Sequence, residues 1–106
     1  MNEHDLDIGD DLEITKTTRR AAGAGTWVTG FLNGHSFSAL VFPEHAERPE
    51  YELGNSRISK LWLRRESDKQ TVCNFDRGWD IRPTTEIAEQ IVAYLSAGLA
   101  EHVFGK

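Results

Sequence analysis

Residues 26–42 read TWVTGFLNGHSFSALVF, and this stretch decides the fold. Two runs rich in β-branched and aromatic residues flank the pair Asn33-Gly34. A two-residue Asn-Gly connection is the strongest short-range signal for a β-hairpin, because both residues accept the positive φ of a type I′ turn. Counting outward from that turn pairs Gly30 with Phe37, whose ring covers the backbone that the glycine leaves bare. The sequence therefore predicts an antiparallel hairpin.

Two further strands follow the hairpin. Residues 57–66 (RISKLWLRRE) and 70–76 (QTVCNFD) alternate in polarity and predict a third and a fourth strand. Residues 43–56 hold two prolines and a Gly-Asn-Ser turn signal, which predict a loop. The strands are therefore expected to form a meander.

The last segment predicts a helix. Thr84 or Thr85 supplies an N-cap directly after Pro83, and an apolar stripe follows at three- and four-residue steps. The stripe consists of Ile87, Ile91, Tyr94, Leu95 and Leu99. Such a stripe has to be buried against a sheet face, so we expect an α+β fold in which one C-terminal helix covers a four-stranded antiparallel meander (ββββα). The expected sheet side of the core is Val28, Phe37, Ala39, Val41, Leu61, Leu63, Cys73 and Phe75.

The N-terminal segment differs in composition from the rest. The formal charge of the 106 residues is −5, and residues 1–13 hold six acidic residues and no Lys or Arg. We expect residues 1–25 to be an acidic flexible leader and residues 26–104 to be a single domain. A short edge strand is the alternative, since Leu12 and Ile14 alternate with polar residues. A single cysteine, no secretory pattern and no membrane-length apolar run favour a cytoplasmic protein without a membrane partner.

Alternation places aromatic and basic side chains on the face that one helix leaves open. The candidate interaction residues on that face are Trp27, Phe31, Lys60, Trp62 and Arg64. Three explanations remain open: the leader or the 43–56 loop covers this face, the chain self-associates through it, or it binds a ligand. We favour a non-enzymatic protein-interaction module that uses this face or the acidic leader, with another protein or a second copy (a homodimer) as partner.

Nucleic acid is the alternative partner for this face. Aromatic and basic residues interleaved on a sheet bind single strands in several folds, and residues 57–82 hold seven basic residues against four acids. The pI of about 5.3 lies far below the value above about 9 that is typical of nucleic-acid modules. The acidic leader also opposes a polyanion, so nucleic acid is weakly supported.

The motif FDRGWDIRP at residues 75–83 is the most distinctive stretch. Asp76, Arg77 and Asp80 beside Trp79 suit a polar site of a small enzyme. The structural interpretation, which we favour, ends a strand at Asp76, places Trp79 against the core and holds the arginine between the two carboxylates. The four histidines lack metal-ligand spacing, and the sequence contains no nucleophile or phosphate-loop motif. We therefore expect no catalytic residues, no metal and no cofactor.

The chain resembles an uncharacterised family of small bacterial and phage-associated domains. The resemblance rests on RISKLWL (57–63), NFDRGWD (74–80) and Pro83, and it covers residues 26–100. It implies a small β-rich domain in a bacterial or mobile-element setting, and it implies no activity.

Overall fold

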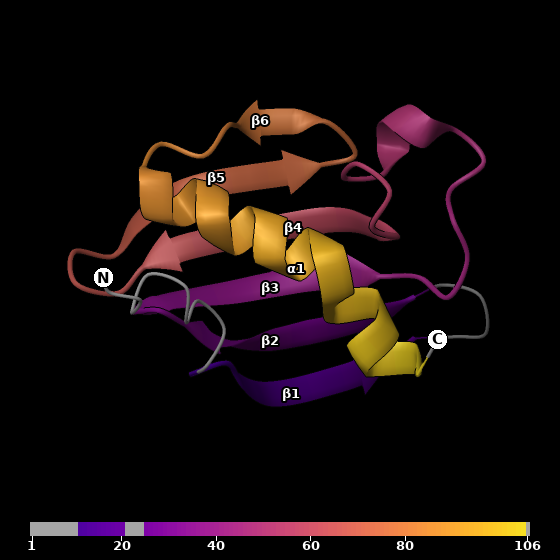
Figure 1. Ribbon diagram of the computed structural model, residues 1–106, viewed down its shortest axis with the longest axis horizontal. Coiled ribbons are helices and arrows are strands. Elements are labelled where there is room, and N and C mark those ends of the chain that lie inside the picture. Colours follow the sequence, from indigo (N-terminus) through magenta and orange to yellow (C-terminus); the bar gives the residue numbers. More distant parts are fainter. Residues whose placement is uncertain (1–10, 21–24, 106) are drawn as a thin grey trace.

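The computed structural model describes residues 11–20 and 25–105, which fold into one antiparallel sheet and one α-helix. The strands are β1 (Glu13–Arg19), β2 (Thr26–Leu32), β3 (His35–Val41), β4 (Ile58–Arg65), β5 (Gln70–Asp76) and β6 (Trp79–Ile81), followed by the helix α1 (Glu86–Phe104). The sheet order is the chain order, so the topology is a meander. Figure 1 shows α1 running obliquely across one face of the sheet, from the β5–β6 side to the β1–β2 side.

The Asn-Gly hairpin is confirmed. Asn33 and Gly34 both have positive φ, at 50° and 75°, as a type I′ turn requires. Gly30 pairs with Phe37, the register that the turn predicts. The hairpin fixes which side chains of β2 and β3 face α1, because successive side chains point to opposite faces.

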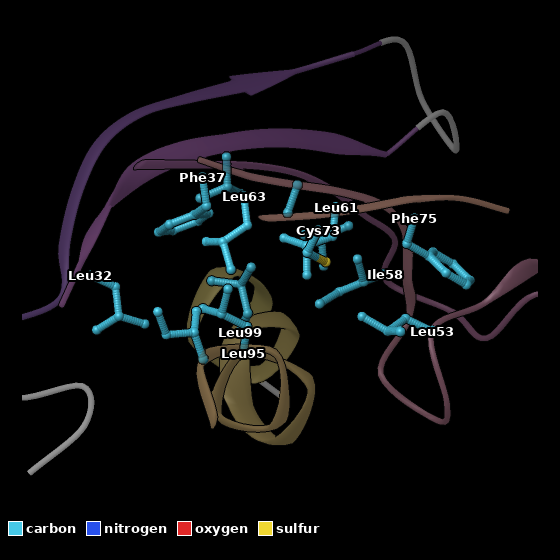
Figure 2. Close-up of a cluster of buried hydrophobic side chains, with 14 of the residues drawn as sticks. Leu32, Phe37, Leu53, Ile58, Leu61, Leu63, Cys73, Phe75, Leu95 and Leu99 are labelled. Atoms are coloured by element: carbon cyan, nitrogen blue, oxygen red, sulfur yellow. The ribbon is translucent and has the colours of Figure 1, made fainter. Parts of the chain in front are cut away.

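The core lies between α1 and the sheet. All eight predicted sheet positions are buried, and Figure 2 shows Phe37, Leu61 and Leu63 above the helix residues Leu95 and Leu99. The helix begins where the side chain of Thr85 accepts a hydrogen bond from the Ala88 N–H at 3.0 Å. Its buried residues are Ala88, Ile91, Leu95, Leu99 and Ala100.

The predicted helix stripe is too wide. Ile87 and Tyr94 are exposed, at 41% and 38%. At 3.6 residues per turn they lie roughly a quarter turn from Leu95, on the flank of the helix. Ala88 lies about 20° from Leu95 around the helix axis and so takes a central position on the buried face.

The predicted number of strands is wrong, because the described residues form six and not four. The strand β1 lies inside residues 1–25 and pairs with β2, which is the edge-strand alternative raised by Leu12 and Ile14. The strand β6 adds three residues beyond β5. Residues 1–10 and 21–24, which carry most of the acidic leader, lie outside the described part of the chain.

Gly30 allows β1 to approach β2. A Cβ added at Gly30 would collide with the Glu13 carbonyl oxygen and would lie 3.1 Å from both the Ile14 Cα and the Phe37 Cε2. The first contact is with backbone, which cannot rotate away. The pairing of β1 with the sheet therefore depends on the absence of a side chain at this position.

Gly30→Ala should lower the free energy of unfolding by about 1–3 kcal/mol, since the added methyl group overpacks the β1–β2 contact. Urea denaturation measures this change, and amide hydrogen exchange should show lost protection in β1. Gly98→Ala is the matched control, because a Cβ at Gly98 meets nothing within 4 Å. That helix substitution should raise stability by about 0.5–1 kcal/mol. A neutral effect of Gly30→Ala would show that β1 is not held as described.

Candidate interaction surface on the open face of the sheet

The strand registers arrange the side chains opposite α1 in three cross-strand rows, which together we call the open face. The rows are Thr18, Trp27, Leu40, Lys60 and Asp76; Lys16, Thr29, Ser38, Trp62, Asn74 and Ile81; and Glu13, Phe31, Ser36, Arg64 and Thr71. All five residues expected at an interaction surface lie in these rows. Their role in recognition stays a prediction.

Two indoles flank a hollow at the centre of the open face. Trp27 on β2 and Trp62 on β4 line a pocket of about 510 Å³ whose other walls are Lys16, Thr18, Thr29 and Ser38. We call it the indole hollow. Because β3 carries small hydroxyl side chains here, the two larger rings stand on either side of it. No residue of the 43–56 loop lines this hollow.

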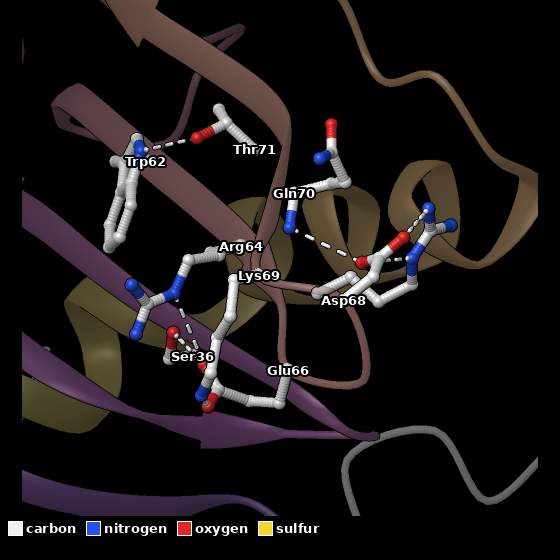
Figure 3. Close-up of polar contacts among 9 residues, drawn as sticks. Ser36, Trp62, Arg64, Glu66, Asp68, Lys69, Gln70 and Thr71 are labelled. Atoms are coloured by element: carbon white, nitrogen blue, oxygen red, sulfur yellow. Dashed lines mark hydrogen bonds and ion pairs between the residues drawn. The ribbon is translucent and has the colours of Figure 1, made fainter.

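The indole of Trp62 is held in a fixed orientation. Its Nε1–H donates a hydrogen bond to the Thr71 Oγ1 at 3.1 Å, as Figure 3 shows. The guanidinium of Arg64 lies 5.3 Å from the centroid of the same ring, in cation–π contact. Phe31, at the end of the face, is 43% exposed and makes no cation–π contact with residues 11–20 or 25–105. Among the aromatic rings of the open face, Trp62 is thus preorganised and Phe31 is exposed.

Two basic side chains of the open face, those of Lys60 and Arg64, lie close to acids. The Lys60 Nζ lies 3.7 Å from the Asp76 Oδ1, and the Arg64 Nε lies 3.3 Å from the Glu66 Oε2. Glu66 also accepts hydrogen bonds of 2.6 Å from the Lys69 Nζ and the Ser36 Oγ (Figure 3). The bond from Lys69, followed by that from Ser36, lowers the pKa of the Glu66 carboxyl to about 2. The carboxylate is therefore charged throughout the physiological range.

This pairing bears on the choice of partner. A polyanion is attracted by cations whose charge is not already compensated. On the open face Lys60 and Arg64 each have an acidic neighbour, so the field that they present together is small. These two pairs lower the attraction of the open face for a polyanion.

The FDRGWDIRP motif differs from the expectation in the position of the Arg77 side chain. Asp76 ends β5 and pairs with Lys60, and Trp79 packs edge-on against Phe75 with ring centroids 5.2 Å apart. Arg77 is not held between Asp76 and Asp80: its guanidinium lies 5.6 Å from the centroid of the Tyr51 ring. The reason is its left-handed backbone, at φ 53°, which directs the side chain out of the turn towards the loop.

The described residues contain no group of three or more His, Cys, Asp or Glu side chains placed to hold a metal ion. His4 lies outside those residues. The thiol of Cys73 is buried, and burial raises its pKa to about 12. A thiol with such a pKa is a poor nucleophile at neutral pH. No helix in the described segments has the length and apolar character needed to cross a membrane.

Sequence reasoning missed a buried carboxylate in the 43–57 loop. The side chain of Glu52 is only 4% exposed. It accepts hydrogen bonds of 2.7 Å from the backbone N–H groups of Ala46 and Arg57, and its Oε2 lies 2.7 Å from the His45 Nδ1. Burial raises the pKa of Glu52, but these hydrogen bonds outweigh burial and lower the pKa below its ordinary value. The only sequence signal was an acid between Tyr51 and Leu53.

These features define a class: a small α+β domain in which a six-stranded meander carries one helix on one face and an aromatic, charge-paired surface on the other. The chain belongs to the family described as Domain of unknown function (DUF7678), whose model matches residues 26–100. The match leaves β1 outside. Comparison with curated proteins and comparison with solved structures each find no match.

Glu66→Gln should lower the free energy of unfolding at pH 7. The reason is that Lys69 and Ser36 form stronger hydrogen bonds with the charged carboxylate of Glu66 than with a neutral amide. Because the pKa of Glu66 is lower in the folded state than in the unfolded state, the ionised carboxylate stabilises the fold at pH values above about 4.5. This stabilisation is lost as the pH falls towards 2. The difference between the variant and the wild type should therefore shrink over that interval in urea titrations. Glu47→Gln, in an exposed loop position, should leave stability at pH 7 unchanged. If the difference in the free energy of unfolding between variant and wild type stays constant with pH, the lowered pKa of Glu66 is contradicted.

Proposed function

We propose that this domain is a non-enzymatic protein-interaction module whose open face is the contact surface. The observation that supports it best is the indole hollow, in which Trp27 and Trp62 stand on a face that no described element covers. Aromatic side chains in a patch with paired charges are typical of protein interfaces, where Trp, Tyr and Arg supply much of the binding energy.

The partner that we infer is a second copy of this chain. The open face carries Trp27 and Phe31 on β2 and the cations Lys60 and Arg64 on β4. Between them, β3 carries Ser36, Ser38 and the buried Leu40. A two-fold axis along β3 lays β2 of one copy over β4 of the other. Trp27 then faces Lys60 and Phe31 faces Arg64, which are cation–π pairs.

The same axis also matches shape. It places Trp62, the large residue of the central row on β4, opposite Thr29, the small residue of that row on β2. The Trp62 indole of each copy thereby enters the indole hollow of the other copy. Ser38 lies on the axis and faces its own equivalent, so the interface has no bulky residue at its centre.

The open face has a suitable size. Five strands about 4.8 Å apart and seven residues long make a surface of roughly 20 × 24 Å. Its projected area is about 500 Å², and a face covered with side chains has more accessible area than its projection. This approaches the ~800 Å² per partner of a stable interface.

Sedimentation equilibrium of the full chain should show a dimer at about 100 μM, a concentration that populates interfaces of micromolar affinity. Ser38→Glu should make the protein monomeric, because it brings two carboxylates together on the axis without changing the core. Circular dichroism checks that the variant remains folded.

Tyr94→Ala is the matched control, since it removes an exposed aromatic residue from the helix side and should leave the dimer intact. A wild-type monomer at about 500 μM, or a Ser38→Glu dimer, would overturn the proposal. Salt-sensitive binding of a single-stranded oligothymidine that Ser38→Glu abolishes would assign the face to nucleic acid instead.

A further inference from the structure

A second pocket lies beside the 43–57 loop, at the end of the sheet where β3 finishes and β4 begins. Its volume is about 580 Å³, within the range of small-molecule sites. We call it the Tyr51 pocket. Leu40, Phe42 and Tyr51 form its apolar and aromatic walls, and Arg20, Lys60 and Arg77 add cations. In Figure 1 the loop extends beyond the ends of β4 and β5.

The loop wall of this pocket is anchored. The buried carboxylate of Glu52 ties together the two ends of the loop by accepting from the Ala46 and Arg57 N–H groups. The Arg57 guanidinium donates to the Pro43 carbonyl at 2.9 Å and lies 3.6 Å from the Glu101 carboxylate on α1. The wall is therefore joined to the helix and to the strand end, so the pocket exists before a ligand arrives.

Arg77 and Tyr51 form the most specific part of the pocket. The turn at φ 53° and a hydrogen bond of 2.9 Å from the Arg77 N–H to the Ser59 carbonyl hold the backbone of Arg77 in place. Its guanidinium then lies 5.6 Å from the Tyr51 ring centroid. This places an aromatic ring and a planar cation side by side at the pocket wall.

The charges of the pocket favour an anion. Four basic residues line it against two acids, Glu44 and Glu52. The carboxylate of Glu52 is already engaged by two backbone donors and His45. Within residues 11–20 and 25–105, neither Arg20 nor Arg77 forms an ion pair. An anion entering this pocket thus meets two cations whose charge no described acid compensates.

We propose that the Tyr51 pocket binds a small amphipathic anion: a planar apolar body carrying one carboxylate, sulfonate or phosphate group. The planar body packs on Tyr51 and Phe42, and the anionic group pairs with Arg77, with Arg20 contributing attraction. Leu40 and Lys60 line both this pocket and the open face. The site does not depend on self-association, because Arg20, Phe42, Tyr51 and Arg77, which carry it, lie outside the rows of the open face. Two sources share this chemistry, a free aromatic acid and a nucleotide.

The test is a heteronuclear NMR titration of the full chain with 2-naphthoate and, separately, with AMP. At least one probe should shift the amide resonances of Phe42, Tyr51 and Arg77 at millimolar concentration. The uncharged analogues 2-naphthalenemethanol and adenosine, and inorganic phosphate alone, should each bind about tenfold more weakly, since each lacks one of the two interactions. Binding of 2-naphthoate alone identifies an aromatic acid, and binding of AMP identifies a nucleotide.

Arg77→Gln should weaken binding about tenfold, a loss typical of one charge-assisted contact. Arg48→Gln is the matched control: the Arg48 guanidinium also lies 5.3 Å from the Tyr51 ring centroid, but the residue does not line the pocket. It should bind as the wild type does. Equal affinity for charged and uncharged probes, shifts confined to Trp27 and Trp62, or no shift at about 5 mM of either anion would overturn the proposal.

Discussion

Because successive side chains of a strand point to opposite faces, a sheet with a helix on one side has two chemically different surfaces. The Asn33-Gly34 turn sets that alternation for β2 and β3, the one strand pair of the described sheet that has no register shift. A shift of one residue would send Trp27 and Trp62 under α1 and expose Val28 and Leu63. The register set by this turn therefore decides both which side chains of the hairpin form the core and which lie on the open face.

Local signals made the central part of the fold predictable. The hairpin, the third and fourth strands and the Thr85 cap each have their signal within a few residues. The edge strands do not: β1 is rich in Thr, Lys and Arg, so its pairing depends on the space that Gly30 leaves. β6 is three residues long and follows a left-handed arginine. The apolar pattern alone also failed to separate Tyr94 on the flank of α1 from Leu95 at its centre.

The open face was predictable as a set of residues, since alternation alone assigns them to one side. Its electrostatics were not. The sequence shows a basic excess around Lys60 and Arg64, whereas the fold brings Asp76 and Glu66 beside them from other segments. The Tyr51 pocket has the same origin: Glu52, Arg77 and Phe42 lie far apart in the chain, and only the turn geometry and the buried carboxylate bring them together.

The outer edge of the sheet has a consequence of its own. The pairing of β1 with β2 is interrupted by a bulge between Ile14 and Lys16, and the strand carries Lys16 and Arg19. At the opposite edge β6 offers only three residues. Bulges, charges and short edges prevent a further strand from adding in register. Both edges of the sheet therefore disfavour its extension by a strand from another molecule.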